Sequence, residues 1–288
     1  IWSSLVGSEM CIRDRPMIIN SDERQWTWMD EGLNTFVQSL TQKEYYKDMP
    51  LRRGTAESIV DYMRSPKDML RPIMTNSEQI ASREFGANAY GKPASALSVL
   101  RETIMGPELF DYAFKEYSRR WAFKHPDPAD FFRTMEDASA IDLDWFWRGW
   151  FYSTDNVDVS VEGVKWFKMK NVDKPFENKA KVENKEIKGK KNQSDDPKYA
   201  MPFEPSEFYF SSTNKNEYRE FMNQVDDEKI KMQNSNKNFY EVTFENKGGL
   251  VTPLIIEWTY EDGSIEIEKL PAEIWRLNET VVSKVFVK

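Results

Sequence analysis

Apolar residues recur at helical spacing through the first half of the chain. The clearest run extends from Trp28 to about Lys47. Its apolar stripe consists of Met29, Leu33, Phe36, Val37 and Leu40. The opposite, polar face consists of Glu31, Asn34, Thr35 and Gln38. This division of faces predicts an amphipathic helix that buries one side and keeps a carboxylate near its start.

Start and stop signals predict further helices. One is expected from near Thr55 to Met63; another follows Pro93 and ends before Gly106, and a third opens at Pro107. Asp127-Pro128 with Asp130 has the form of a helix cap, and aromatic-rich helices are expected over residues 130–138 and 143–151. Residues 16–152 therefore predict an all-helical region.

After Ser153 the apolar period changes from helical to alternating. Val157-Asp-Val-Ser-Val161 alternates as a strand does, and further strands are expected over 240–244, 254–260, 265–270 and 281–287, with tight turns at Lys247-Gly-Gly249 and Asp262-Gly263. Residues 168–206 are rich in Lys, Glu, Asn and Asp, which predicts a charged flexible insertion. A short strand at 208–210 and a helix over 217–231 follow it. Residues 153–288 thus predict a small β-sandwich.

Composition narrows the class of protein. The chain has 288 residues, 40% of them hydrophobic, and a formal net charge of −8. That charge argues against a nucleic-acid partner, and no apolar segment approaches the length of a membrane-spanning helix. Cys11 is the only cysteine, so the redox compartment stays open; an exported protein is slightly favoured over a cytoplasmic one.

Residues 1–15 differ from the rest of the chain. They read Ile-Trp-Ser-Ser-Leu-Val-Gly-Ser-Glu-Met-Cys-Ile-Arg-Asp-Arg and resemble the translation of sequencing-adapter DNA. We therefore expect a non-native segment here, with a genuine divergent N-terminus as the alternative.

Three ordered motifs lie between residues 16 and 152. The first is Asp30-Glu31-Gly32 at a helix start just after Trp26 and Trp28, and the second is Tyr90 in Ala89-Tyr-Gly-Lys-Pro. The third is the segment from His125 to Glu136, followed by Asp142-Leu-Asp-Trp-Phe-Trp-Arg-Gly-Trp150. Together they resemble the gluzincin aminopeptidases, the alanyl-aminopeptidase/leukotriene-hydrolase family of zinc metallopeptidases. Gly91 and Pro93 stand where this family usually has a charged residue and a glycine.

The resemblance implies a fold and a chemistry. It implies the helical half of a thermolysin-like catalytic domain, in which Glu31 is a zinc ligand and Tyr90 donates a hydrogen bond to the oxyanion of the tetrahedral intermediate. Peptides would be the substrates. The family takes its other two ligands from His-Glu-x-x-His, about eighteen residues earlier. This chain has Ser8 and Ile12 at those positions, so we expect the chain as written to be inactive.

Two alternatives remain open. A non-catalytic, peptidase-like binding or scaffold protein would have lost the metal motif. An unrelated helical domain joined to a sandwich-type interaction module would place Glu31 and Tyr90 far apart, whereas the family resemblance places them on one concave wall. The single histidine, His125, is expected at the surface, because one imidazole does not make a metal site.

Overall fold

The computed structural model describes residues 18–45, 50–168 and 237–288. The adapter-like residues 1–15 lie outside the described residues. So do all but the first residue of the predicted insertion, the predicted strand at 208–210 and the predicted helix over 217–231. Contacts divide the chain into two compact units, Ile1–Val157 with Gly248–Ile274 and Asp158–Lys247 with Trp275–Lys288.

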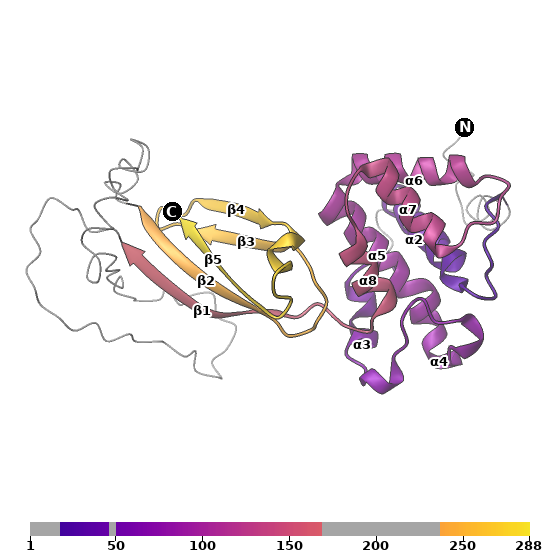
Figure 1. The fold of residues 1–288 in the computed structure, drawn as a ribbon, viewed down its shortest axis with the longest axis horizontal. Helices are drawn as coiled ribbons and strands as arrows, with labels where there is room; N and C mark the ends of the chain where they lie inside the picture. The colour runs from indigo at the N-terminus through magenta and orange to yellow at the C-terminus, as the bar shows by residue number, and fades with distance from the viewer. Residues whose placement is uncertain (1–17, 46–49, 169–236) are drawn as a thin grey trace, which may run out of the picture. The chain divides into compact units, whose positions relative to one another are not determined.

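The described part of the first half is helical, as the apolar periodicity predicts (Figure 1). The α-helices are α2 (Glu31–Tyr45), α3 (Val60–Met63), α4 (Ser82–Phe85), α5 (Lys92–Val99), α6 (Pro107–Trp121), α7 (Pro128–Ser139) and α8 (Asp144–Tyr152). Short 3-10 turns are η2 (Thr27–Met29), η3 (Glu57–Ile59), η4 (Lys67–Met69) and η5 (Ser77–Gln79). The expected cap before α7 is confirmed. Asp127 accepts from the backbone of Asp130, and the Asp130 side chain accepts from the backbone of Asp127.

Tightly packed aromatic rings form the core of this helical region. Trp28 is almost fully buried and stacks on Phe132 with 5.9 Å between ring centroids, while Phe151 meets it edge-on at 4.8 Å. The aromatic residues of α8 belong to the same core, with Trp147 stacked on Phe132 at 4.5 Å. Such packing holds the start of α2 in place, because Trp28 lies in η2, three residues before the first residue of α2.

The α-helix α5 begins at Lys92, as the Pro93 signal predicts, but the expectation that Tyr90 lies before the helical run was wrong, because the chain is helical from Ser82 to Met105. We expected the helix to begin near Pro93, with Tyr90 just before it. Instead α4 continues through a π-helical turn, η6 (Gly86–Gly91), into α5 and a second π-turn, η7 (Leu100–Met105). Proline has no backbone N–H and crowds the preceding turn, so the normal helical ladder is interrupted there, and the wider π-turn accommodates it.

The second half contains antiparallel strands at the predicted places. They are β1 (Val159–Lys168), β2 (Asn238–Asn246), β3 (Leu254–Thr259), β4 (Ile265–Leu270) and β5 (Val281–Val287), with a 3-10 turn, η8 (Ala272–Trp275), before the last. They form a three-stranded sheet in the order β1-β2-β5 and a two-stranded β3-β4 hairpin. The hairpin turn has Gly263 at φ 81°, as its Asp-Gly signal predicts. The two-layered sandwich itself stays a prediction.

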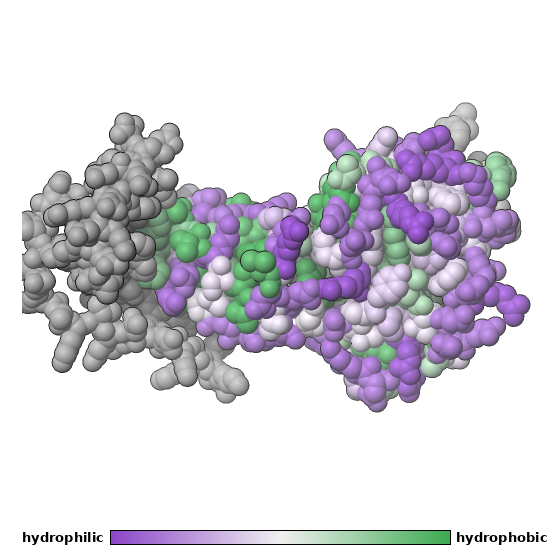
Figure 2. All heavy atoms as spheres, viewed as in Figure 1, coloured by the Kyte–Doolittle hydropathy of each residue, from purple (hydrophilic) through white to green (hydrophobic). Residues whose placement is uncertain are grey.

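The two kinds of region differ in surface character. Figure 2 shows a mainly hydrophilic surface over the helices and hydrophobic patches over the strands. On the β3-β4 hairpin, Ile255, Ile265 and Ile267 are each more than half exposed. Among the described residues, no helix is both long and apolar enough to cross a membrane.

Candidate functional site

The site begins where η2 ends and α2 starts. Asp30 closes the 3-10 turn, and Glu31 is the first residue of α2. A carboxylate is favoured at that place by the partial positive charge of the helix N-terminus. Glu31 is half-buried, whereas the side chain of Asp30 is almost completely covered. The sequence Asp-Glu therefore gives one accessible carboxylate and one enclosed carboxylate.

Gly32 brings the π-turn η6 against the start of α2. A Cβ atom at this position would lie 2.7 Å from Cγ of Pro93 and 3.1 Å from the carbonyl oxygen of Ala89. Real Cβ atoms do not approach other atoms that closely, so glycine is what permits this contact. The third residue of the Asp-Glu-Gly motif thus has a packing role in bringing the two helical segments together.

Tyr90 lies in η6 and reaches across to α2. Its hydroxyl donates a hydrogen bond of 2.5 Å to Oε1 of Glu31. The ring of Phe85 meets the Tyr90 ring edge-on at 6.2 Å, and the guanidinium carbon of Arg53 lies 4.4 Å from the Tyr90 ring centroid. Three contacts from three segments therefore define where the phenol lies.

Neighbouring charges and burial change the acidity of the groups around this hydrogen bond. Burial raises the pKa of Tyr90 to about 12, and its hydrogen bond to Glu31 adds to the shift, while the charge of Arg53 opposes it. Burial also raises the pKa of Asp30 to about 7, reinforced by a hydrogen bond with Glu23 and by the charge of Glu31. The phenol is therefore a neutral donor at neutral pH.

Lys92, two residues after Tyr90, is fully buried. Its Nζ donates a hydrogen bond of 2.9 Å to the carbonyl oxygen of Ser153, which directly follows α8. Burial lowers the pKa of Lys92 to about 8, and the nearby charge of Asp155 opposes that shift. This ammonium group ties the start of α5 to the end of α8 at the negative end of that helix.

The structure brings together both site residues that the sequence predicts. Glu31 and Tyr90 are in direct contact, which contradicts the expectation of an unrelated domain that they lie far apart. Their roles in chemistry stay predictions. His125 is exposed, with Nδ1 at 3.0 Å from the carbonyl oxygen of Asn20, so its expected surface position is confirmed.

Sequence reasoning missed two residues next to the site. Arg53 comes from residues 50–56, which precede η3, and no sequence pattern signals its contact with Tyr90. Lys92 belongs to the motif that suggested Tyr90, but its burial could have been suspected only from the apolar residues that follow it. Arg53 contacts Tyr90 within η6, and Lys92 directly follows η6.

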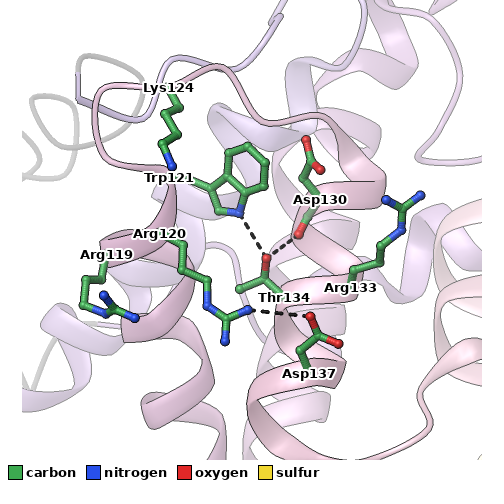
Figure 3. A pocket seen from close by; sticks show the side chains of 8 residues that line it. All are labelled: Arg119, Arg120, Trp121, Lys124, Asp130, Arg133, Thr134 and Asp137. Carbon is green, nitrogen blue, oxygen red and sulfur yellow. Dashed lines mark hydrogen bonds and ion pairs between the residues drawn. The ribbon is translucent and has the colours of Figure 1, made fainter.

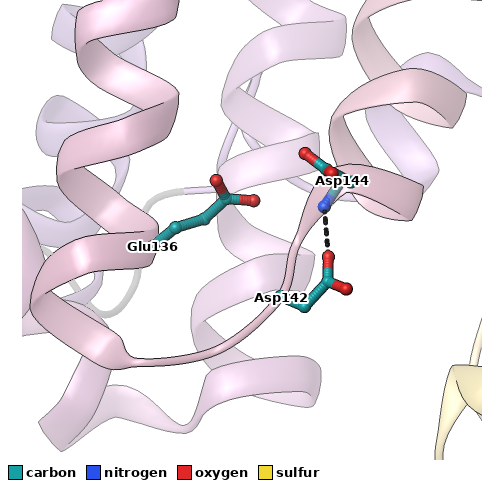
Figure 4. A group of neighbouring side chains, drawn as sticks. All are labelled: Glu136, Asp142 and Asp144. Atoms are coloured by element: carbon teal, nitrogen blue, oxygen red, sulfur yellow. Dashed lines mark hydrogen bonds between the residues drawn. The ribbon is translucent and has the colours of Figure 1, made fainter.

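Two other groups of charged side chains lie away from Glu31 and Tyr90. Glu136, Asp142 and Asp144 have carboxylate oxygens within 4.8 Å of one another (Figure 4). Two of these carboxylates serve the local backbone: Glu136 accepts from the amide of Leu143 at 3.0 Å, and Asp142 accepts from that of Asp144 at 3.1 Å. The cluster therefore caps the start of α8.

The second cluster is an open pocket of about 530 Å³ between the end of α6 and α7 (Figure 3). Its basic side chains are partly paired, since Arg120 contacts Asp137 at 3.6 Å and Arg119 contacts Glu116 at 2.7 Å. Neither Glu31 nor Tyr90 lines it.

Comparison with known proteins finds a family match for the helical region. Residues 19–150, which hold Glu31 and Tyr90, match the peptidase family M1 domain. The resemblance to gluzincin aminopeptidases is therefore confirmed, in that the helical region matches the domain of this peptidase family.

The chain is also similar to two individual proteins. Human glutamyl aminopeptidase is 26% identical over 153 residues, which cover 51% of this chain and 16% of the human protein. The crystal structure of Legionella pneumophila aminopeptidase A in complex with aspartic acid aligns with 91% of this chain and 21% of that chain, at 12% identity and a TM-score of 0.43. The chain thus corresponds to less than a quarter of the length of either relative.

Proposed function

We propose that this chain is part of a zinc-dependent aminopeptidase, in which Glu31 is a metal ligand and Tyr90 a catalytic hydrogen-bond donor. The observation that carries the proposal is the direct contact between the Tyr90 hydroxyl and the Glu31 carboxylate. These two residues come from separate helical segments, and they lie within the region that matches the peptidase family M1 domain.

The residues of this chain fit only part of a zinc site. Catalytic zinc sites have three protein ligands, and Glu31 supplies one carboxylate. The only imidazole in the chain belongs to His125, which contacts Asn20 instead. We therefore expect the chain as written to hold no stoichiometric zinc and to have no peptidase activity. When bound, zinc would polarise the scissile carbonyl and lower the pKa of the attacking water.

Tyr90 has the chemistry of an oxyanion donor. A neutral phenol donates a strong hydrogen bond without bringing a charge that must be neutralised. The pKa of Tyr90 is raised to about 12, so the proton stays on the phenol through the range in which peptidases work. In the proposed reaction the hydroxyl turns from Glu31 to the oxygen on which negative charge develops.

The proposed substrates are peptides with a free N-terminus. The family and the name of the human relative support this substrate class. The competing hypothesis is a peptidase-like binding protein without catalysis. It is favoured by the absence of the two histidine ligands, since Ser8 and Ile12 stand at their expected positions.

Re-sequencing of the source gene and assay of the protein it encodes test the proposal. The codons upstream of Pro16 are to be re-sequenced, and the encoded protein produced. A His-Glu-x-x-His motif ending before Pro16, stoichiometric zinc and hydrolysis of aminoacyl anilides support the proposal. In that protein Glu31→Gln should lower the zinc content, whereas Tyr90→Phe should keep zinc and lose about 10²–10³-fold in kcat. If Ser8 to Ile12 is confirmed as genomic, the catalytic proposal is wrong and the binding protein takes its place.

A further inference from the structure

Arg53 makes a contact that neither the family resemblance nor the proposed function assigns. Its guanidinium carbon lies 4.4 Å from the centroid of the Tyr90 ring, within the range of a cation–π interaction. Arg53 is exposed, and among the described residues it forms no ion pair with a carboxylate. The face of the Tyr90 ring is therefore the partner that the structure shows for this cation.

The backbone beside Arg53 is anchored to the helix that follows Tyr90. Two hydroxyl groups of α5 donate to this backbone: Ser98 to the carbonyl oxygen of Gly54 at 2.8 Å, and Ser95 to that of Thr55 at 2.7 Å. Both hydroxyls belong to a helix continuous with η6, which carries Tyr90. The backbone next to Arg53 is thus anchored to the same continuous helix that carries Tyr90.

The backbone conformation of Gly54 determines the path of the chain next to Arg53. Its φ is +83°, in the left-handed region that favours glycine, and a Cβ there would lie 2.9 Å from the side chain of Ser39 on α2. The segment therefore follows one path between α2 and α5. A cation delivered by such a segment is placed more reproducibly than one on a free loop.

We propose that Arg53 is a positioning residue for Tyr90, which holds the phenol ring in the plane that directs its hydroxyl toward Glu31. A half-exposed tyrosine can rotate about its side-chain bonds, so contacts must hold it if it is to donate in a fixed direction. Arg53 covers the face of the ring and Phe85 meets the ring edge-on.

The geometric part of this proposal is testable in the chain itself by NMR. A guanidinium over an aromatic face experiences the ring current, so the Nε–H proton of Arg53 is expected upfield of those of other arginines. Tyr90→Phe keeps the ring and should retain this upfield shift, whereas Tyr90→Leu should abolish it. An Arg53 signal that is the same in wild type and Tyr90→Leu overturns the contact.

Positioning is tested by the reverse experiment. Arg53→Gln should move the Tyr90 ring-carbon signals, and Arg53→Lys, which keeps a cation, should partly restore them. The exposed neighbour Arg52 provides the matched control, because Arg52→Gln changes the charge equally without removing the ring contact. Equal effects of Arg53→Gln and Arg52→Gln would contradict the proposal.

The catalytic meaning of this positioning rests on the proposed function, and the two can fail separately. In a zinc-containing protein with the complete motif, Arg53→Gln should lower kcat by about ten- to a hundredfold at unchanged zinc content, with partial rescue by Arg53→Lys. A wild type without zinc or turnover refutes the proposed function and leaves the NMR result standing. A wild type with turnover that Arg53→Gln does not change refutes the positioning role.

Discussion

Gly32 on α2 lies directly against Pro93 on α5, at a distance that leaves no room for a side chain. A Cβ atom on Gly32 would be 2.7 Å from Cγ and 2.8 Å from Cβ of Pro93. The residue next to Gly32 is Glu31, and the turn before Pro93 carries Tyr90. The contact between the two candidate site residues therefore depends on this close approach of the backbones.

Gly32→Ala should separate the two segments and destabilise the protein. Overpacking against a rigid proline ring costs about 1–3 kcal/mol, because neither the ring nor the backbone of Ala89 can yield easily. Urea unfolding followed by tryptophan fluorescence measures the loss. Gly86→Ala is the matched control, since its Cβ would meet only the Arg53 guanidinium at 3.7 Å. Equal stability of the two variants would show that the contact at Gly32 is not limiting.

Much of the helical region could be predicted because its signals are local. The cap at Asp127 and Asp130, the helix start at Pro107 and the apolar stripe of α2 each act within one or two turns. The strands were predictable for the same reason, from alternation and from the turn at Gly263. In such segments neighbouring residues alone determine the backbone.

The rest of the site depends on contacts between residues distant in sequence. The π-turn at Tyr90 was missed because Pro93 is a normal helix-start signal, and only the continuous helix before it reveals the interruption. The approach of Arg53 to Tyr90 requires the path of residues 50–56, which α2 and α5 determine. The pairing of Glu31 with Tyr90 followed from the family resemblance and not from spacing.

Asp30 should make the protein less stable as pH rises. The pKa of an aspartate in an unfolded chain is 3.8, and in the fold that of Asp30 is raised to about 7, mainly by burial. The native state therefore holds this proton more tightly than the unfolded chain does. The contribution of Asp30 to the free energy of unfolding is complete below about pH 4 and is lost as the pH rises through about 7. A tenfold change in proton affinity corresponds to about 1.4 kcal/mol, so the expected loss is on the order of 2–4 kcal/mol.

Asp30→Asn cannot ionise and should remove this part of the pH dependence. Urea unfolding at pH 5 and pH 8 gives the difference in stability for the wild type and the variant. Asp68→Asn, at an exposed aspartate, controls for the change in net charge. A wild type that is equally stable at both pH values after subtraction of this control would contradict the raised pKa of Asp30.

Lys92 should contribute to stability through both its stem and its ammonium group. Lys92→Ala removes a fully buried side chain and the donor to Ser153, so the free energy of unfolding should fall by about 2–4 kcal/mol. Lys92→Met keeps most of the packed volume and removes a charge that burial disfavours, so its loss should be smaller. Equal losses in denaturant unfolding would show that the bond to Ser153 outweighs the packing of the stem.

The hydrogen bond between Tyr90 and Glu31 should appear as a coupling energy in the chain without metal. Hydrogen bonds to charged groups contribute about 1.5–3 kcal/mol, and the partial exposure of both side chains reduces this toward about 1 kcal/mol. Unfolding measurements on Tyr90→Phe, Glu31→Ala and the double variant give the coupling, because the cycle cancels the separate effect of Glu31 on the helix dipole. The same cycle with Tyr62→Phe in place of Tyr90→Phe should show no coupling, since the Tyr62 hydroxyl donates to the carbonyl oxygen of Arg71. Zero coupling for Tyr90 would mean that the two groups are held together by the backbone contact at Gly32 and not by their own bond. The site would then be preorganised by packing, and the Tyr90 hydroxyl would turn toward a developing oxyanion without first giving up a stabilising bond.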